Sequence, residues 1–294
     1  MQVGRYQILE TLGTGAHSRV VRGFDPLIDR PVAIKLLSPE LARGEARTRF
    51  LREARVVGKL SDPFIITLHD MGIEESTSTP YLVMELVEGQ SLEKTLTSGS
   101  VPFPTACAWA SQVAGALHTA HRRNIIHGDI KPANILITLE SRTKLTDFGM
   151  ARLASHQHHG DTSLLGTPAY WCPEQIMGRP QDARSDLFSL GGVLYELLTG
   201  ESPFHADSIQ AVCTRVLSSA PLPPSRRNST VPQALDEIVM KCLTKDPSFR
   251  PVSGDNLAEL LYPLARRKAI SQVNQPSQQQ STLRDRAAKL LRSA

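Results

Sequence analysis

One short stretch of the sequence, and a carboxylate just beyond it, carry side chains suited to phosphate chemistry. The stretch His127–Asn134 supplies a carboxylate at Asp129, an ammonium at Lys131 and an amide at Asn134. A second carboxylate, Asp147, follows thirteen residues after Asn134. Carboxylate and amide oxygens are ligands that suit Mg²⁺, which also binds the phosphates of nucleotides. The order and spacing of these groups predict a site that holds a nucleoside triphosphate with magnesium and deprotonates a hydroxyl.

The segments that must position these groups begin with a region of strand character. Residues 1–85 contain several short runs rich in β-branched or alternating apolar residues, a pattern typical of strands. These runs are Tyr6–Leu12, Val20–Phe24, Pro31–Leu37, Ile65–Met71 and Tyr81–Val87. Between the third and the fourth, Ala46–Leu60 repeats apolar residues at spacings of three and four, which predicts one amphipathic helix.

Beyond Glu88–Ser91, which interrupts this pattern, the chain becomes mainly helical. The clearest expected helices are Thr105–Arg122, Asp186–Leu198, Ile209–Leu217 and Ala234–Leu243. A small β-rich part followed by a larger helical part predicts an α+β fold with two lobes that join near Glu85–Gly89.

Size and composition are those of an ordinary globular protein. The 294 residues are 40% hydrophobic and 21% charged, which allows one large or two ordinary domains. The apolar runs are only as long as strands, and the N-terminus lacks the apolar core of a signal peptide, so we expect no integral membrane segment. Four scattered cysteines without a Cys-x-x-Cys pair argue against disulfides and zinc, and favour a cytoplasmic location.

The net charge of +4 is unevenly distributed along the chain. Residues 1–265 carry 26 Lys/Arg and 28 Asp/Glu, whereas residues 266–294 carry seven and one. The nearly neutral main body argues against nucleic-acid binding. In the tail, Gln272–Gln280 is a polar linker, and Thr282–Asp285 matches a capping box ahead of a short basic helix. We expect a solvated tail, with contact to a partner or an anionic membrane surface as the alternative.

Further motifs surround the first two: a glycine-rich turn, a strand that ends in lysine, an apolar strand with its exit, and two segments of the helical half. They are Leu12–Val20, Val32–Lys35, Tyr81–Gly89, Gly166–Glu174 and Asp246–Pro251. Together with His127–Asn134 and Asp147–Gly149, they resemble the protein kinase family over roughly residues 4–265. The similarity is greatest to the bacterial, eukaryotic-like (Hanks-type) serine/threonine kinases.

This resemblance implies a bilobal, kinase-like α+β fold. The small β-rich lobe with one main helix would span about residues 1–85, the hinge about 85–89, and the larger, mostly helical lobe about 90–265. The kinase domain would thus cover residues 1–265, and residues 266–294 would form the polar linker and basic helical tail.

The resemblance also implies how ATP is bound. The glycine-rich loop would approach the phosphates, although Ser18 replaces its third glycine. Lys35 would bind the α- and β-phosphates while paired with Glu53. Met84 would be the gatekeeper, and backbone groups around Glu85 and Val87 would bind adenine. The implied ATP-binding residues are Leu12, Gly13, Thr14, Gly15, Ala16, His17, Ser18, Arg19, Val20, Ala33, Lys35, Met84, Glu85 and Val87.

For the reaction itself, the resemblance implies that Asp129 accepts or orients the proton of the substrate hydroxyl. Lys131 would contact the γ-phosphate, and Asn134 and Asp147 would bind the metal. A lysine two residues after the aspartate is similar to serine/threonine rather than tyrosine kinases. Structural roles are implied for Phe148, Gly149, Glu174, Asp186 and Arg250. Of these, Glu174 and Arg250 would form a buried ion pair, and Asp186 would hold the catalytic loop.

The chain departs from the family pattern at Gly128, where an arginine that pairs with a phosphorylated loop residue is common. We therefore expect activity to depend little on phosphorylation of this loop. Candidate autophosphorylation sites are Thr162, Ser163 and Thr167. His121 is interpreted as a packing residue of a core helix, and the loop histidines His156, His158 and His159 as polar loop residues rather than a metal site.

The resemblance implies a protein serine/threonine kinase that uses ATP and Mg²⁺, with Mn²⁺ as a substitute, and acts on protein substrates. Two alternatives stay open: a pseudokinase that serves as a scaffold, and a small-molecule kinase of the same fold. The complete set of polar groups argues against the first alternative, and Gly166–Glu174 argues against the second, because in the family it lies beside the phosphorylated residue.

Overall fold

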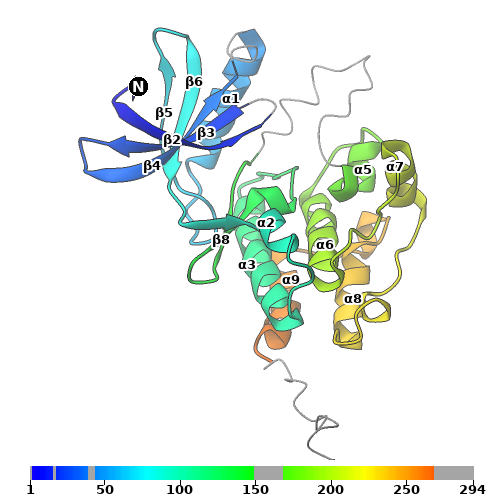
Figure 1. The fold of residues 1–294 in the computed structure, drawn as a ribbon. Coiled ribbons are helices and arrows are strands. Elements are labelled where there is room, and N and C mark those ends of the chain that lie inside the picture. The colour runs from blue at the N-terminus through cyan, green and yellow to red at the C-terminus, as the bar shows by residue number, and fades with distance from the viewer. Residues whose placement is uncertain (1, 16–17, 39–43, 149–167, 268–294) are drawn as a thin grey trace, which may run out of the picture.

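The computed structural model describes residues 2–15, 18–38, 44–148 and 168–267. Within the helix at 44–57, the side chains at positions 45, 46, 49, 52, 53 and 56 lie outside the described part. The chain forms a sheet-rich lobe with one helix and a larger helical lobe (Figure 1), which confirms the predicted bilobal α+β fold. Over the described ranges, none of the helices is both long and apolar enough for a membrane crossing.

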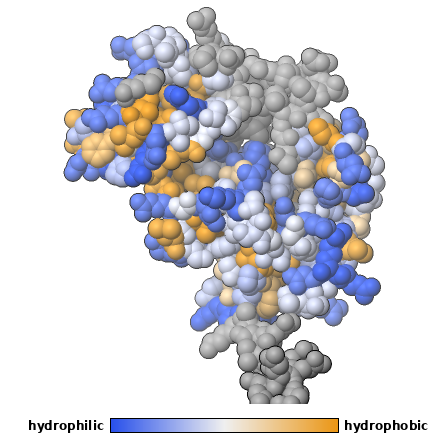
Figure 2. Space-filling model, in the orientation of Figure 1, coloured by the Kyte–Doolittle hydropathy of each residue, from blue (hydrophilic) through white to orange (hydrophobic). Residues whose placement is uncertain are grey.

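The sheet-rich lobe contains six antiparallel strands in the order β1-β2-β3-β4-β6-β5. They are β1 (Gln2–Val3), β2 (Tyr6–Thr14), β3 (Ser18–Asp25), β4 (Arg30–Leu37), β5 (Leu68–Glu74) and β6 (Thr79–Glu85). Hydrophobic residues gather over this lobe in Figure 2. Its exposed large apolar side chains are Leu9, Leu12, Leu27 and Ile28.

The alternation of β4 determines which way its lysine points. Val32, Ile34 and Leu36 enter one apolar cluster of the sheet, whereas Leu37 packs with the helix on the other face. Because successive strand residues point to opposite faces, Lys35 shares the face of Leu37. In register, Lys35 lies opposite Val20 on β3 and Leu82 on β6, so the lysine occupies the centre of the sheet.

Helix α1 (Gly44–Val57) covers that face of the sheet. Its apolar stripe buries Phe50 and Ala54 against Leu37 and Leu82. The predicted end at Leu60 was wrong: the helix ends at Val57, and the N–H of Gly58 bonds the Ala54 carbonyl at 2.8 Å. Glycine, the least favourable residue of a helix interior after proline, explains the early end.

The helical lobe is built from α2 (Leu92–Leu96), α3 (Phe103–His121), α5 (Pro173–Ile176), α6 (Ala183–Thr199), α7 (Ile209–Ser218), α8 (Gln233–Cys242) and α9 (Gly254–Ala265). Helix α6 lies at the centre and is buried on nearly all sides. A capping box starts it, because the Asp182 carboxylate accepts the Arg184 N–H and Ser185 Oγ accepts the Asp182 N–H. Left-handed Gly200 (φ +80°) ends it.

A second sheet of three short strands lies between the sheet-rich lobe and the helices of the larger lobe, in the order β7-β8-β9. The strands are β7 (Gly89–Ser91), β8 (Ile135–Thr138) and β9 (Thr143–Leu145). Sequence patterning did not predict them, because strands of three or four residues are too short to show alternation. The β8–β9 hairpin is functionally important because Asn134 immediately precedes it and Asp147 follows it.

Two predicted strand boundaries were wrong in the same region. Strand β5 begins at Leu68 rather than Ile65, and β6 ends at Glu85 rather than Val87. Ile65 instead forms an isolated parallel bridge with Leu145 of β9, and the Ile66 N–H bonds the Leu145 carbonyl at 2.9 Å. Backbone pairing between the lobes has replaced pairing within the sheet.

Helices α3 and α9 pack closely because α9 begins with a glycine. A Cβ at Gly254 would lie 2.2 Å from the Ala114 carbonyl oxygen and 3.0 Å from the His118 nitrogen, both backbone atoms of α3. Only a residue without a side chain fits this contact.

We therefore predict that Gly254→Ala lowers the free energy of unfolding by about 1–3 kcal/mol, the usual cost of overpacking. The control is Gly115→Ala in α3, the helix that Gly254 contacts, because a Cβ added at Gly115 meets no atom within 4 Å. That change should raise stability by up to about 1 kcal/mol through helix propensity. Urea denaturation of both variants measures the difference, and equal effects would contradict the packing argument.

Candidate active site

The loop between α3 and β8 is held by one buried carboxylate from α6. Asp186 accepts the backbone N–H of His127 at 2.9 Å and that of Gly128 at 2.8 Å. Gly128 has φ +74°, a left-handed conformation that glycine adopts without strain. Asp186 is only 1% exposed, so these bonds form away from water and hold the loop firmly against the helix.

His121 also contacts this carboxylate, and the interpretation of His121 as a packing residue was wrong. Its Nε2 lies 2.7 Å from Asp186 Oδ2, and the ring is nearly buried. Within the described residues, its Nδ1 is buried and has no hydrogen-bond partner.

The loop then brings three polar side chains together. Lys131 Nζ lies 2.7 Å from Asp129 Oδ2, and Asn134 Nδ2 donates to the same oxygen at 2.9 Å and to the Asp129 carbonyl at 2.8 Å. The short helix η2 (Pro132–Asn134) turns the chain so that Asn134 faces back toward Asp129. With Nδ2 engaged twice, Asn134 keeps its Oδ1 as the acceptor for a cation.

Asp147 closes the other side of the site, two residues after β9. Its Oδ1 lies 2.7 Å from Lys35 Nζ, which joins the two lobes through an ion pair with side chains 28% and 7% exposed. Burial alone would raise the pKa of Asp147, but Lys35 outweighs it and, with His127 and Thr146, holds the pKa below its usual value. Asp147 has φ +66°, a strained conformation of the kind found at functional sites.

His127 links the loop to the Asp147 segment, a role that sequence analysis did not assign. Its Nδ1 accepts the Asp129 N–H at 3.2 Å, so its Nε2 carries the proton and donates to the Thr146 carbonyl at 2.9 Å. The ring also packs on Phe148, with centroids 4.6 Å apart. His127 is fully buried, and its two bonds set the spacing between the two carboxylates.

The donor set fits a divalent metal that arrives with a nucleotide. Asn134 Oδ1 and the Asp147 carboxylate offer oxygen donors of the kind that Mg²⁺ prefers. Over the described residues, no three His, Cys, Asp or Glu side chains are grouped to hold a metal by themselves. Such a partial set suits Mg²⁺, which keeps waters and leans on substrate phosphates.

The glycine-rich turn is described except at its tip. Gly13 pairs with Val20 and Thr14 with Arg19, and the Gly15 N–H bonds the Ser18 carbonyl at 2.8 Å. Ala16 and His17 lie outside the described residues. Leu12 is 49% exposed on β2, and Thr14 and Gly15 are exposed as well. Thr14 and Gly15 are thus exposed at the end of the β2–β3 hairpin.

Beside the hinge, Ala33 and Met84 are paired across β4 and β6 and are both buried. The Glu85 N–H donates to the Thr67 carbonyl at 3.0 Å and is therefore engaged within the lobe. Val87 lies past the end of β6 and is partly buried. Backbone recognition of a base would accordingly use groups beyond the Glu85 N–H.

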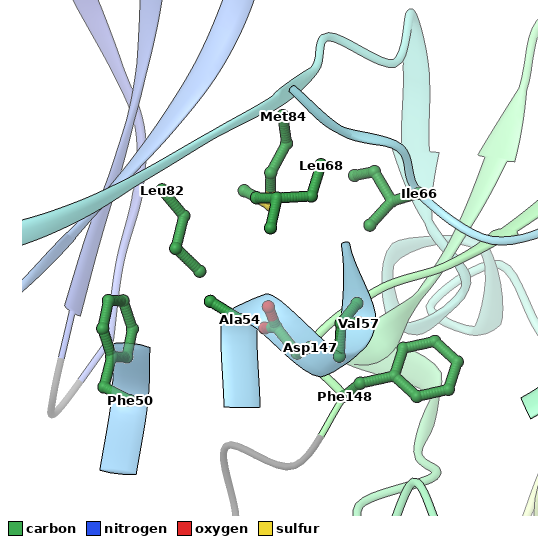
Figure 3. A pocket seen from close by; sticks show the side chains of 9 residues that line it. All are labelled: Phe50, Ala54, Val57, Ile66, Leu68, Leu82, Met84, Asp147 and Phe148. Atoms are coloured by element: carbon green, nitrogen blue, oxygen red, sulfur yellow. The ribbon is translucent and has the colours of Figure 1, made fainter. Parts of the chain in front are cut away.

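An apolar cavity of about 40 Å³ lies between α1, the sheet and the Asp147 segment (Figure 3). Its lining residues are Phe50, Ala54, Val57, Ile66, Leu68, Leu82, Met84, Asp147 and Phe148. The position of Glu53 on α1 is described, but its side chain is not, so its pairing with Lys35 stays a prediction.

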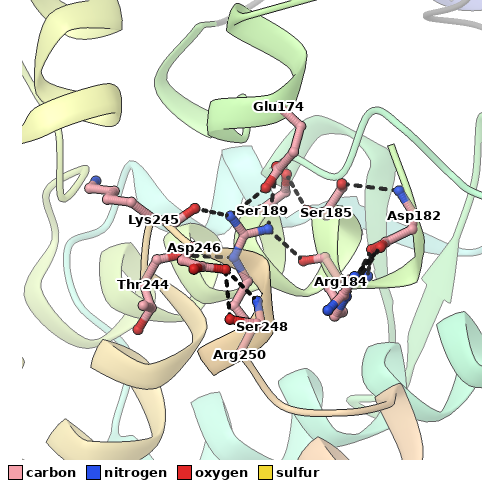
Figure 4. Close-up of polar contacts among 10 residues, drawn as sticks. All are labelled: Glu174, Asp182, Arg184, Ser185, Ser189, Thr244, Lys245, Asp246, Ser248 and Arg250. Carbon is pink, nitrogen blue, oxygen red and sulfur yellow. Dashed lines mark hydrogen bonds and ion pairs between the residues drawn. The ribbon is translucent and has the colours of Figure 1, made fainter. Parts of the chain in front are cut away.

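Away from the cleft, Glu174 and Arg250 form a two-pronged ion pair (Figure 4). Arg250 Nη2 lies 2.7 Å from Glu174 Oε1, and Nη1 lies 3.3 Å from Oε2. Arg250 also donates to the carbonyls of Thr244, Arg184 and Lys245, at 2.8, 3.1 and 2.8 Å. These bonds satisfy a guanidinium that is fully buried and connect α5 to the segment before α9.

Several residues singled out in the sequence lie outside the described residues. They are Gly149, Thr162, Ser163, Thr167, the three loop histidines, and the tail beyond residue 267. The roles assigned to them stay predictions.

Comparison with known proteins gives the same picture over most of the chain. The profile of the family described as protein kinase domain matches residues 6–261. The chain is 41% identical to serine/threonine-protein kinase PknB of Mycolicibacterium smegmatis over 84% of its length. It is 39% identical to serine/threonine-protein kinase PksC of Streptomyces coelicolor over 87% of its length. It covers 40% and 48% of those two proteins, so it spans less than half the length of the curated relatives it matches.

A solved structure is similar over nearly the whole fold. The PknI kinase domain of Mycobacterium tuberculosis superposes with a TM-score of 0.71 at 27% sequence identity. The match covers 90% of this chain and 97% of that one.

The buried ion pair yields a stability prediction. Glu174→Gln leaves the Arg250 guanidinium, which is 0% exposed, without its counter-charge. Breaking one side of a buried pair costs about 3–5 kcal/mol, and we expect a loss of that order in urea denaturation. The matched control is Glu10→Gln, which removes the exposed pair with Arg22 and should change stability little. Similar losses in both variants would contradict this account.

Proposed function

We propose that this chain, which belongs to the protein kinase domain family, transfers the γ-phosphate of ATP to serine and threonine hydroxyls of proteins. The carrying observation is that Lys35 and Asp147 meet across the lobes beside a loop that gathers Asp129, Lys131 and Asn134. Separate segments thus supply both the charges that bind phosphates and the base that such a transfer needs.

The roles follow from the contacts. Asn134 and Asp147 would hold a divalent metal, which we propose is Mg²⁺, with Mn²⁺ as a substitute. When bound, that metal would neutralise part of the phosphate charge. Asp129 accepts or orients the hydroxyl proton, and its carboxylate is kept in place by the Asn134 amide and the Lys131 ammonium. Lys131, held at the carboxylate, is positioned to stabilise negative charge that develops on the transferred group.

Lys35 is the phosphate-binding cation of the sheet-rich lobe in this proposal. Its side chain is nearly buried, and it already contacts Asp147, the proposed metal ligand. One ammonium can therefore orient the α- and β-phosphates and also keep the Asp147 carboxylate ionised. Glu53 on α1 is proposed as a second partner that keeps Lys35 in this position.

Serine/threonine specificity is supported by Lys131 two residues after Asp129 and by the similarity to the serine/threonine-protein kinases PknB and PksC. We propose protein substrates presented along the segment that ends at Glu174, in a kinase domain spanning residues 1–265. We also propose that the chain acts in the cytoplasm, because the thiols of Cys107, Cys172 and Cys242 are buried and free. The basic tail is proposed as a solvated extension or a contact to a partner or membrane surface.

The decisive test compares wild type with Asp129→Asn in a radiolabelled-ATP assay with magnesium and a protein substrate. We expect the substitution to lower the rate by about 10²–10⁴-fold, the usual contribution of a positioned base. Phosphoamino-acid analysis should find phosphoserine and phosphothreonine. Equal transfer by both proteins, or none by either, contradicts the proposal; preferential transfer to a sugar or aminoglycoside would favour a small-molecule kinase.

Regulation yields a second test. Gly128 occupies the position of the arginine that commonly pairs with a phosphorylated loop residue, so we expect the doubly substituted Thr162→Ala, Ser163→Ala protein to keep most of its activity. The measurement is the rate with a fixed peptide substrate after both proteins have been preincubated with ATP and magnesium, so that the wild type can phosphorylate its loop. A fall of tenfold or more (~1.4 kcal/mol in barrier height) would refute independence from loop phosphorylation.

A further inference from the structure

Two cations of the helical lobe share one pair of stacked aromatic rings. Phe188 on α6 and Phe204 are parallel within 4°, with centroids 5.9 Å apart, and both are 1% exposed. Lys245 Nζ lies 4.0 Å from the Phe204 centroid and 5.5 Å from that of Phe188. The Arg250 guanidinium carbon lies 4.8 Å from the Phe188 centroid. An ammonium and a guanidinium thus lie against the same small apolar surface.

The backbone and the side chain of Lys245 face different ways. Its carbonyl accepts Arg250 Nη2 at 2.8 Å, while its side chain extends away from the guanidinium (Figure 4). At the other end, Nζ reaches the Arg215 carbonyl of α7 at 3.5 Å, in a contact at the exposed surface. Arg215 is itself exposed, and its guanidinium bonds the carbonyl of His205 next to Phe204. The amine is therefore anchored on three sides but reachable from solvent.

The charged groups around this amine are mostly of its own sign. The Arg250 guanidinium shares the Phe188 ring with Nζ, and Arg215, a second basic residue, contacts Nζ through its backbone carbonyl. The nearest acidic groups are engaged elsewhere: Glu174 pairs with Arg250, and Asp246 accepts the N–H and the hydroxyl of Ser248. In the part of the chain that the structure describes, no carboxylate lies within ion-pair distance of Lys245.

Burial, and then the charge of Arg250, lower the pKa of Lys245 to about 8. The attraction of the ring faces for a cation works in the opposite direction. At pH 7.5, a lysine with that pKa is neutral in about a quarter of the molecules, compared with about 0.1% for an ordinary lysine of pKa about 10.4. Only the neutral amine is a nucleophile.

We propose that Lys245 is an acylation site of this chain and that its donor is an acyl phosphate. The Nζ lone pair attacks the carbonyl carbon, a C–N bond forms, and the C–O bond to phosphorus breaks. Inorganic phosphate leaves with the electron pair, and the amine releases a proton to water. Arg215 is exposed and its backbone carbonyl lies 3.5 Å from Nζ, so its guanidinium is the cation that would attract the donor's phosphate to this surface, which distinguishes this donor from a neutral acyl ester.

Acylation changes the contact chemically. The resulting amide has no charge, so it loses its attraction to the Phe204 ring and no longer repels Arg250. Its single N–H can still reach the Arg215 carbonyl, but as a neutral and weaker donor. The Lys245 contact at that carbonyl is one of the contacts of the last turn of α7, so hydrogen exchange of the amides in that turn should be faster in acylated protein.

The test treats the full chain with acetyl phosphate at pH 7.5 and measures acetylation by mass spectrometry after digestion with a protease that does not cut at lysine. Lys241, exposed on the neighbouring α8, is the internal comparison. A lower pKa also makes the neutral amine a weaker nucleophile; for thiols the Brønsted coefficient of this effect is about 0.4–0.5. We therefore expect Lys245 to be acetylated about tenfold faster than Lys241. Its rate should level off above about pH 8, while that of Lys241 continues to rise.

Two variants keep the proposal falsifiable. Lys245→Arg keeps the charge and should abolish the label at this position alone. Arg215→Gln should slow labelling by acetyl phosphate but not by a neutral acetyl ester. The proposal is overturned if Lys245 is labelled no faster than Lys241. It is also overturned if the two labelling rates rise in parallel with pH above about pH 8. Because acyl transfer is the readout, this result is independent of phosphotransfer activity.

Discussion

The carboxylate of Asp186 is the contact on which the candidate site depends. It accepts hydrogen bonds from two backbone N–H groups of the loop and contacts Nε2 of His121, all inside the helical lobe. A buried carboxylate that loses its donors is expensive, so the loop conformation and the packing of α6 stabilise each other. Asp129 and Asn134 inherit their positions from this arrangement, because they follow the anchored residues directly in the chain.

The charges of the site are arranged in close opposite pairs. Lys131 lies 2.7 Å from Asp129 in the helical lobe, and Lys35 lies 2.7 Å from Asp147 across the cleft. The proposed triphosphate and divalent metal would therefore meet complementary charges of both signs that need little reorganisation. His127, buried between the two carboxylate-bearing segments, keeps them at a constant spacing through hydrogen bonds at both ring nitrogens.

The bilobal fold and the approximate positions of the long helices could be predicted from the sequence, because they follow from local periodicity. The polar groups of His127–Asn134 could also be predicted, because they are contiguous in the sequence. The contacts of His121 and His127 could not be predicted. The partner of His121 lies 65 residues away in the sequence, and that of His127 lies 19 residues away. The start of β5 was missed because Ile65 and Ile66 pair with Leu145 of β9 rather than with β6.

Glu85 has a mechanical consequence for the whole molecule. Its carboxylate Oε1 accepts the Thr67 N–H at 2.8 Å and Lys144 Nζ at 2.7 Å, so one oxygen ties the hinge to the strand connection above it and to β9 below it. Rotation of one lobe against the other must pivot about this oxygen or break one of its bonds. Because the lysine bond is ionic and partly exposed, dissolved salt weakens it, so the stiffness of the interlobe joint decreases with ionic strength.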